Sequence, residues 1–389
     1  MEWKEVLLSE FLEFNPKRTI KKNEVARKIT MDLLIPHSKQ IYSFKYEPYT
    51  GGAKFSNGDT IMARITPCLE NGKHAYVSCL NEGEIAYGST EYIVLCGKNG
   101  VSDNEFVYYL SHTPQFVNTA IKSMVGSSGR QRAQVPVLEN LIMPVPVNLS
   151  DQRKIAGILS DLDSKIENNN KINANLEAQA QALFKSWFVD FTPFKDQPFV
   201  DSELGPIPQG WKVGTLFDVA NLHDRYRRPL SSNQRSLMAK KYPYYGATSL
   251  MDFVEDYIFD GEYVLMGEDG SVVTEKGYPF IQYVWGKIWV NNHAHVLSGK
   301  DGFPTELLIP FLKTYNIKGL VTGAVQAKLN QANMAQIQIP IPPKENINNI
   351  SVIIKSIYKK YRLLTEENQR LAALRDTLLP KLMSGEIKL

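Results

Sequence analysis

The chain has 389 residues, with 44 Lys and Arg against 41 Asp and Glu and a formal net charge of +3. Its 43% hydrophobic and 22% charged content is that of a folded protein and excludes disordered and collagen-like classes. No apolar run approaches the roughly 20 residues of a membrane span, and the charged N-terminus predicts no signal peptide, so we expect a cytoplasmic protein. Three cysteines without metal-ligand spacing, Cys68, Cys79 and Cys96, are expected to be reduced and structural.

Residues 1–149 predict a first globular domain. Runs rich in β-formers, such as 75–77 and 91–95, alternate with Gly, Asn and Asp turns, and a helical stretch is expected near 104–122. This pattern is typical of a mixed, loop-rich α/β (α+β) domain.

Two stretches nearly free of Gly and Pro, 150–190 and 345–389, predict long helices. Apolar residues recur at heptad spacing in both, as in the seams of a coiled coil. Asn173 and Asn368 occupy equivalent seam positions, where a polar residue fixes register at a cost in stability. Pro380 predicts a kinked or separate last turn. The predicted seam comprises Ile155, Leu159, Leu162, Ile166, Asn173, Leu176, Leu183, Ile350, Ile357, Tyr361, Leu364, Asn368, Leu371 and Leu378.

A Pro-rich stretch, 191–210, reads as an extended, fairly stiff linker, and 211–344 reads as a second mixed domain with strands near 263–266 and 287–290. A helix of about 36 residues spans roughly 54 Å. About 16 extended residues reach at most roughly 53 Å, so a parallel helix pair would strain the linker. We therefore expect the two helices to pair antiparallel.

Landmarks recur in the same order in the two halves, which indicates an internal pseudo-two-fold repeat. Trp3 is matched by Trp211 and Gly58 by Gly261, and a Pro-x-Pro segment precedes each long helix. No P-loop, nucleophile elbow, H-E-x-x-H zinc motif or amino-methyltransferase motif is present. Asn15-Pro-Lys-Arg resembles the amino-methyltransferase motif only superficially. No catalytic residue or resident cofactor is therefore expected.

His293 and His295 are two residues apart, which on a strand places both rings on one face. A metal pair is one reading, but without a third ligand a structural role is favoured, and we predict no metal site.

Three segments resemble conserved regions of type I restriction-modification DNA specificity subunits: 150–166, 203–211 and 371–386. The resemblance implies a non-catalytic chain in which two target-recognition domains, 1–149 and 211–344, each read one half of a bipartite, asymmetric double-stranded DNA target. It also implies that two methyltransferase subunits bind along the helices and that two motor-nuclease subunits join in the full complex. S-adenosylmethionine, ATP and Mg would then be held by those partners.

Candidate DNA contacts follow from the chemistry of base and phosphate recognition, which uses Arg, Lys and polar side chains on projecting loops. A Gly/Ser loop near 126–134 and the equivalent segment near 322–330 are the strongest candidates. Basic and aromatic residues near 225–228 and 240–245 are candidates for backbone contacts, and Glu268 for accepting from a cytosine amino group. The predicted contacts are Arg64, Lys73, Ser127, Ser128, Arg130, Gln131, Arg132, Gln134, Arg225, Arg227, Arg228, Lys240, Lys241, Glu268, Gln326, Lys328 and Asn330.

The alternative reading is a coiled-coil scaffold that carries two protein-binding modules and no DNA site. Salt dependence discriminates the two, because DNA binding weakens steeply as salt rises.

Overall fold

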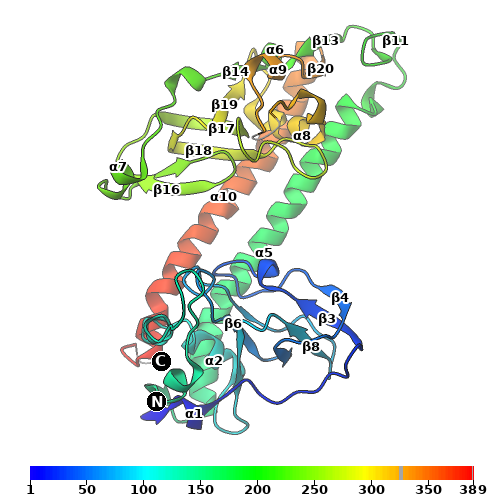
Figure 1. The fold of residues 1–389 in the computed structure, drawn as a ribbon. Helices are drawn as coiled ribbons and strands as arrows, with labels where there is room; N and C mark the ends of the chain where they lie inside the picture. Colours follow the sequence, from blue (N-terminus) through cyan, green and yellow to red (C-terminus); the bar gives the residue numbers. More distant parts are fainter. Residues whose placement is uncertain (324–326, 388) are drawn as a thin grey trace. The chain divides into compact units, whose positions relative to one another are not determined.

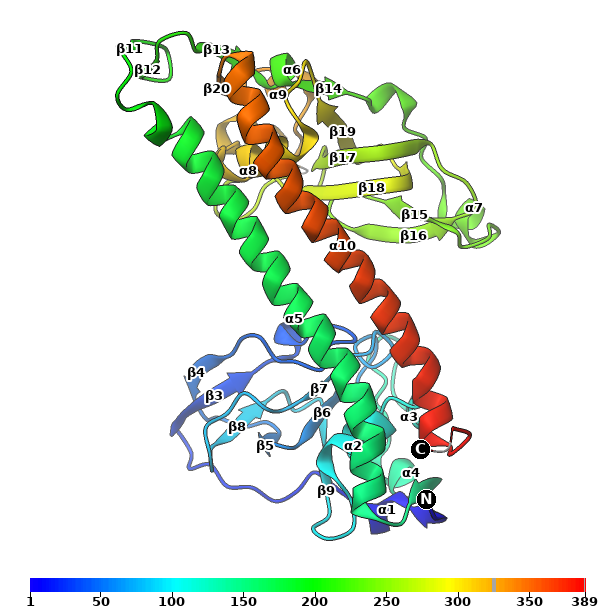
Figure 2. The same cartoon turned by 180° about the vertical axis from the view of Figure 1, so that it is seen from behind.

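The computed structural model describes residues 1–323, 327–387 and 389. It divides into two compact units: unit 1 comprises Met1–Asn170 and Glu366–Leu389, and unit 2 comprises Lys171–Thr365. Figure 1 follows the chain by colour, and Figure 2 shows the same ribbon from behind. Because both long helices pass from one unit to the other, each unit contains a stretch of both.

Unit 1 is built on two four-stranded sheets, in the orders β2-β9-β6-β7 and β4-β3-β8-β5, and on the antiparallel pair β1-β10. Its strands are β1 (Trp3–Leu7), β2 (Leu12–Phe14), β3 (Val25–Ile29), β4 (Lys45–Pro48), β5 (Lys54–Ser56), β6 (Thr60–Ala63), β7 (His74–Tyr76), β8 (Ile85–Gly88), β9 (Tyr92–Gly97) and β10 (Ile142–Pro146). Its short helices are α1 (Leu8–Phe11), η1 (Met31–Leu33), α2 (Asn104–Leu110), α3 (Pro114–Lys122) and α4 (Val135–Glu139).

Unit 2 is built on one six-stranded sheet, in the order β14-β19-β17-β18-β15-β16, and on two antiparallel pairs, β13-β20 and β11-β12. Its strands are β11 (Phe199–Val200), β12 (Ile207–Pro208), β13 (Lys212–Thr215), β14 (Ala220–Leu222), β15 (Tyr242–Tyr245), β16 (Leu250–Val254), β17 (Phe259–Gly267), β18 (Ile281–Val290), β19 (Ala294–Gly299) and β20 (Gln338–Ile341). Its short helices are η2 (Thr192–Phe194), α6 (Leu216–Val219), η3 (Asp224–Tyr226), α7 (Ser232–Ser236), α8 (Thr305–Thr314), η4 (Lys318–Leu320) and α9 (Gln331–Met334).

The two units share one sheet plan, which is interrupted in unit 1. In unit 2, β17 runs unbroken and pairs along its length with β18. In unit 1 a turn at Gly58, where φ is +91°, divides the corresponding strand into β5 and β6, and a loop divides its partner into β7 and β8. Rejoining these halves gives the strand order of unit 2, and the parallel pair β3-β8 matches the parallel pair β15-β18. The mixed fold and the internal repeat are therefore confirmed.

The long helices are α5 (Leu149–Phe188) and α10 (Lys344–Met383). In unit 1, Asp163 of α5 contacts Arg375 of α10, and Asn169 contacts Asn368, so residue numbers rise on one helix as they fall on the other. The pair is antiparallel, as expected. Gly385, with φ of +75°, lies just beyond the end of α10 and takes the left-handed conformation that commonly ends a helix.

Each unit buries its helix segments in its own core. In unit 1, Ile155 and Leu159 of α5 and Leu382 of α10 pack in one cluster with Phe106 and Phe116. In unit 2, Ala180, Phe184 and Phe188 of α5 pack with Ile350 and Ile354 of α10. Among the described residues, no helix combines the length and the apolar character that a membrane crossing requires.

The last turn of α10 was expected to be kinked or separate, and the structure excludes a separate turn. Helix α10 continues through Pro380 to Met383, and Leu379 and Leu382 are buried and hold that turn against the core. The stretch 191–210 is not an extended linker, because β11 and β12 form a hairpin and Phe194 packs edge-to-face on Trp211 at 5.1 Å. Its aromatic side chains supply enough apolar surface to fold the segment onto unit 2.

Candidate nucleic-acid interface

The loop that follows α3 in unit 1 has an anchored base and an exposed tip. Antiparallel bridges join Arg132 to Val125 and to Ile65. Gly126 and Gly129 have positive φ and turn the chain between them. At the tip, Ser127, Ser128 and Arg130 are exposed. We call residues 125–134 the first loop.

The base of the first loop is fixed by an ion pair. The guanidinium of Arg132 donates to both carboxylate oxygens of Glu91, at 2.6–3.0 Å, and these hydrogen bonds lower the pKa of Glu91. Gln134 donates to the Arg132 carbonyl. The Gln131 amide donates to the Thr66 hydroxyl, and the Gln131 carbonyl accepts from the Thr66 amide. The side chains of Arg132 and Gln134 thus hold the loop, whereas Arg130 is free to contact a partner.

Arg64 and Lys73, which flank a turn in the sequence, have different surroundings. The backbone of Arg64 links the first loop to the sheet, because its carbonyl accepts from the Ala133 amide at 2.8 Å and its amide donates to the Glu91 carbonyl at 2.9 Å. Among the described residues its guanidinium has no ion-pair partner, and its Nε is buried without a hydrogen bond. Lys73 donates to the Met31 carbonyl at 2.7 Å and so serves the fold of unit 1.

A basic cleft of about 640 Å³ opens beside Arg64. It is lined by the segment Asn15–Arg18, by Lys54 at the start of β5 and by Tyr92 and Val94 of β9. Sequence reasoning missed Lys17, Arg18 and Lys54. The basic residues of Asn15-Pro-Lys-Arg are evident in the sequence. They indicate a binding site only once the folded sheet places Arg64 beside them.

The corresponding loop of unit 2 is closed by the same kind of bridges, Thr322 to Lys328 and Asp269 to Lys328. We call residues 322–330 the second loop. Lys328 is exposed, with its ammonium 3.6 Å from a Glu268 oxygen. Asn330 caps α9, because its side-chain oxygen accepts from the Asn333 amide at 2.8 Å. Gln326 lies outside the described residues.

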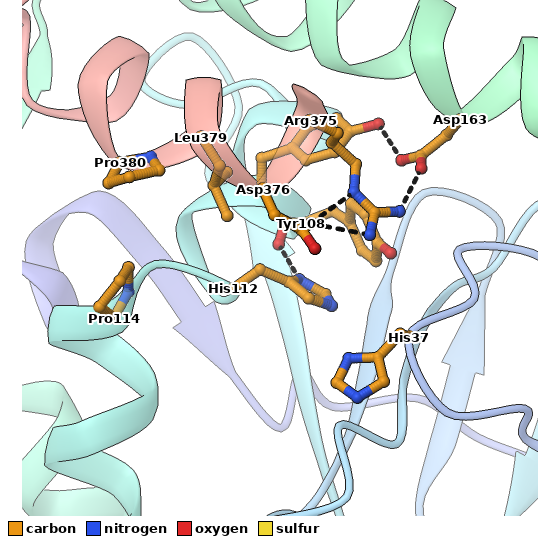
Figure 3. A pocket seen from close by; sticks show the side chains of 10 residues that line it. His37, Tyr108, His112, Pro114, Asp163, Arg375, Asp376, Leu379 and Pro380 are labelled. Atoms are coloured by element: carbon orange, nitrogen blue, oxygen red, sulfur yellow. Dashed lines mark hydrogen bonds and ion pairs between the residues drawn. The ribbon is translucent and has the colours of Figure 1, made fainter. Parts of the chain in front are cut away.

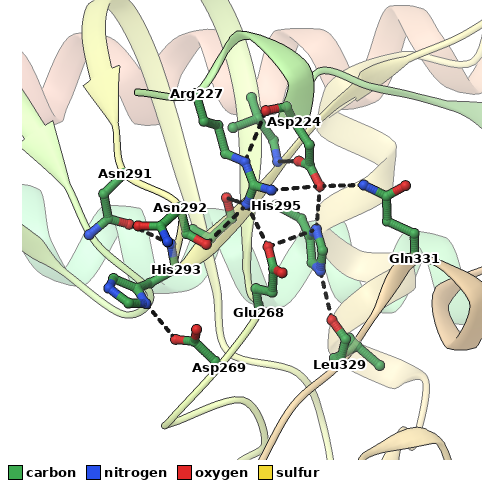
Figure 4. A network of polar contacts seen from close by, with 12 residues as sticks. Asp224, Arg227, Glu268, Asp269, Asn291, Asn292, His293, His295, Leu329 and Gln331 are labelled. Atoms are coloured by element: carbon green, nitrogen blue, oxygen red, sulfur yellow. Dashed lines mark hydrogen bonds and ion pairs between the residues drawn. The ribbon is translucent and has the colours of Figure 1, made fainter. Parts of the chain in front are cut away.

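A buried charge network lies under the second loop (Figure 4). Arg227 donates to Glu268 at 2.6 Å and lies 3.2 Å from Asp224. His295 places Nδ1 2.6 Å from Asp224 and Nε2 2.7 Å from the Leu329 carbonyl. Each ring nitrogen of His295 therefore has an oxygen within hydrogen-bond distance. Burial alone would raise the pKa of Asp224, but the hydrogen bond and charge of His295 lower it below the ordinary value.

This network changes the meaning of several predicted residues. Arg227 and Glu268 bind each other inside unit 2, where their side chains are only 12% and 16% exposed. Asp224, Glu268 and His295 lie close enough to share a metal ion, but Arg227 already supplies the compensating positive charge. The expectation that both histidine rings share one face of a strand was wrong. His293 precedes β19 and pairs with Asp269 at 2.7 Å, whereas His295 lies within the strand.

The other basic residues predicted in unit 2 are exposed. Arg225 stacks on the Tyr226 ring at 4.6 Å, and Lys241 lies 5.0 Å from the Tyr242 ring. Lys240 pairs with Asp252 at 2.8 Å. The guanidinium of Arg228 has no hydrogen-bond or ion-pair partner within the part of the chain that the structure describes.

The helix contacts are polar near the middle of both helices. In unit 1, Asn169 donates to Glu367 and Asn368, each at 2.9 Å, and in unit 2 Asn173 donates to Thr365 at 3.1 Å. None of the predicted seam residues is exposed; Ile155, Leu159, Asn173, Ile350 and Leu364 are buried, and the others are half-buried.

An ion pair joins the two helices within unit 1 (Figure 3). Arg375 donates to Asp163 at 2.6 Å, and the second oxygen of Asp163 accepts from the Tyr109 hydroxyl, also at 2.6 Å. A cavity of about 260 Å³ lies beside them and is lined by His37 and His112 among others. The Nδ1 of His112 donates to the Tyr108 carbonyl at 2.9 Å, and burial lowers the pKa of His112 to about 4.

Comparison with known families decides the class. The family model described as type I restriction modification DNA specificity domain matches residues 1–178 and 208–373, which is most of the chain and both halves of the repeat. The chain belongs to the type I restriction-modification DNA specificity family. Specificity subunits are the non-catalytic components of type I complexes, so the prediction that the chain is not an enzyme is confirmed.

Individual members of the specificity family are similar over different lengths. A putative specificity subunit of Haemophilus influenzae is 39% identical over 148 residues, 38% of this chain and 37% of that relative. The MjaIX specificity subunit of Methanocaldococcus jannaschii is 28% identical over 75% of this chain and 70% of its own. A crystal structure of the type I S subunit from M. genitalium has a TM-score of 0.53 and 18% identity, covering 98% of this chain and 96% of that one, and supports the fold alone.

Proposed function

We propose that this chain is the DNA-recognition subunit of a type I restriction-modification complex and that each globular domain reads one half of a bipartite, asymmetric target. The observation that carries the proposal is the pair of equivalent loops. Both are closed by antiparallel bridges at matching positions, Arg132 and Lys328, and each projects from its own unit. Because the two loops have equivalent backbones but different side chains, we expect them to recognise different half-sites.

The helix pair is proposed to set the distance between the half-sites and to dock two methyltransferase subunits, with two motor-nuclease subunits joining in the full complex. Polar contacts at Asn169 and Asn173 support a fixed register, because each amide has a specific partner on the other helix. S-adenosylmethionine, ATP and Mg are assigned to those partners and none to this chain.

The test is the methylated motif in cells that express this chain with its methyltransferase. We expect two unlike half-sites separated by unspecified bases. Replacing residues 1–149 with the first domain of another family member should change one half-site and leave the other unchanged. A continuous palindrome, or a swap that alters both halves, would contradict the proposal.

A further test addresses the spacing. Insertion of four residues, about one helical turn, into α5 between Ile155 and Leu183 should lengthen the preferred gap without changing either half-site, with some loss of stability because the heptad shifts. If the folded, active variant complex kept the same gap, the proposal that the helix pair sets the spacing would be contradicted.

A further inference from the structure

The basic cleft of unit 1 carries more positive charge than its surroundings compensate. Four cationic side chains line it, Lys17, Arg18, Lys54 and Arg64, and no acidic side chain does. Arg18 pairs with the buried Asp59 at 2.5 Å, and Lys54 donates to the Arg18 carbonyl at 3.0 Å. Among the described residues, Lys17 and Arg64 have no acidic partner. Four cations facing one concave surface constitute a site for an anion.

One residue of the cleft lining is buried and carries a hydroxyl. Tyr92 lines it, is only 3% exposed, and its hydroxyl has no hydrogen-bond partner among the described residues. The ring fits because residue 88 is glycine, where a Cβ would lie 2.6 Å from the Tyr92 ring. Burial raises the pKa of Tyr92 far above its ordinary value, so the group is an O–H donor at neutral pH. A buried, unsatisfied donor costs free energy unless a ligand accepts from it.

We propose that this cleft binds a phosphate group, namely a backbone phosphodiester of the DNA strand that the first loop contacts; this inference rests on the proposed function. A phosphate offers several acceptor oxygens and a negative charge, which match the ammonium groups of Lys17 and Lys54, the guanidinium of Arg64 and the Tyr92 hydroxyl. Arg64 joins the cleft to the first loop through the hydrogen bond from Ala133. The phosphate contact therefore fixes the strand in register with Arg130 at the loop tip.

At the matching position of unit 2, the described residues pair their charges with one another. The strand ladders align Met62 and Ile93 with Met266 and His295, so Arg64 corresponds to Glu268 and Tyr92 to Ala294. There the guanidinium of Arg227 donates to the Ala294 carbonyl at 2.8 Å and to Glu268. Arg227 is thus paired in unit 2, whereas Lys17 and Arg64 of unit 1 have no acidic partner among the described residues. Within the part of the chain that the structure describes, the proposed phosphate site therefore lies in unit 1.

The experiment uses the full chain and a duplex carrying its selected target, with single neutral methylphosphonates placed along each strand. For the wild-type protein, a methylphosphonate at one position next to the first half-site should weaken binding of the duplex. In the Lys17→Gln/Lys54→Gln variant, that position should lose its effect, and the slope of log affinity against log salt should shrink by about 0.9 for each phosphate that the variant no longer neutralises. Lys4→Gln removes an exposed lysine on β1 as the matched control and should leave both readouts unchanged.

Tyr92→Phe removes only the hydroxyl. It should weaken target binding about three- to tenfold while leaving the salt slope unchanged, as expected for one hydrogen bond. Uniform sensitivity to methylphosphonates in wild type and double variant alike would overturn the inference. So would ³¹P line broadening of inorganic phosphate that the double variant abolishes, if no backbone position is sensitive, because the ligand is then a free phosphate. A wild-type chain that selects no bipartite target refutes the proposed function instead.

Discussion

At matching places in their sheets, unit 1 and unit 2 hold opposite charges. Arg64 in unit 1 corresponds to Glu268 in unit 2. The loop cation of each unit therefore meets a different carboxylate: Arg132 pairs with Glu91, whereas Lys328 lies near Glu268. The backbone frame is nearly the same, because each loop closes with a bridge to the second residue after the matching strand, Ile65 in unit 1 and Asp269 in unit 2. The sheet therefore fixes where each loop projects. Side chains that take no part in holding the loop in place decide which charges and hydrogen-bonding groups each domain presents to a partner.

The helix contacts differ between the units in the same way. At an offset of 195 residues, Asp163 corresponds to Tyr358 and Arg375 to Ala180. Unit 1 therefore joins the helices by a partly buried ion pair, whereas unit 2 packs Tyr358 and Ala180 in its apolar core.

The largest expected effect is at the helix pair of unit 2. Leu364 is 4% exposed, so Leu364→Asp buries an unpaired charge and should lower the free energy of unfolding by about 4 kcal/mol or more. The neighbouring Leu363 is 50% exposed, and Leu363→Asp is the control, with a change within about 0.5 kcal/mol. Denaturant unfolding and methyltransferase co-purification measure both. A normal complex formed by Leu364→Asp would contradict the seam assignment.

Two arginines sharpen the comparison of the sheets. Arg227→Met leaves Asp224 and Glu268 without their guanidinium and should cost about 3–5 kcal/mol of stability, as for a buried pair that loses one partner. Arg64→Met breaks no ion pair and should cost less than about 1 kcal/mol. Hydrogen exchange resolves which unit is affected. Equal destabilisation by both variants would mean that the cleft of unit 1 is as charge-compensated as the network of unit 2.

Acid should loosen unit 1 through its buried histidines. Burial lowers the pKa of His112 to about 4 and that of His74 well below its ordinary value near 6.5. Unfolding therefore takes up protons between these values, so the free energy of unfolding falls as pH drops from about 6.5 towards 4, by about 3 kcal/mol for His112.

The readout is the hydrogen-exchange protection of α2 and β7 at pH 7, 6 and 5. His74→Phe keeps a ring against His112, whose ring centroid is 4.7 Å away, and should flatten part of the pH dependence. Protection of α2 and β7 that did not change between pH 7 and pH 5 would contradict this expectation.

The smallest effect on stability is expected at the tips of the loops. Arg130→Ala should leave unfolding unchanged, because Arg130 is exposed and its side chain has no partner among the described residues. If Arg130 reads a base, target binding should weaken by about 1–3 kcal/mol and selectivity should relax only in the first half-site. Lys328→Ala is the counterpart for the second. Competition binding against single-base variants of each half-site decides between them.

The sequence predicted the architecture because its evidence is periodic and repeated. Heptads need only the spacing of leucines and isoleucines, and the repeat needs only landmarks such as Trp3 and Trp211 in a constant order. The cleft could not be predicted, because Lys17, Lys54, Arg64 and Tyr92 come from four segments that meet only in the folded sheet.

The direction in which a side chain points could not be predicted from the sequence either. Nothing in the sequence distinguishes Arg225, Arg227 and Arg228. Of these three, only Arg227 points into unit 2, because it pairs there with Asp224 and Glu268. The stretch 191–210 misled for a related reason: its prolines indicate an extended chain, but the burial of Phe194 and Ile207 outweighs that local preference.

The division of α10 between the units has a consequence for the order of events on the ribosome. Residues 171–365 of unit 2 are contiguous, whereas unit 1 needs 366–389, including the buried Leu379, Leu382 and Met383. At roughly 5–20 residues per second, the first-made domain waits about ten seconds or more for its last helix segment, with the apolar surface of Phe116 and Leu159 lacking part of its cover. The part of the protein synthesised first is thus completed last, and during that interval it is the nascent chain's most exposed target for chaperones and proteases.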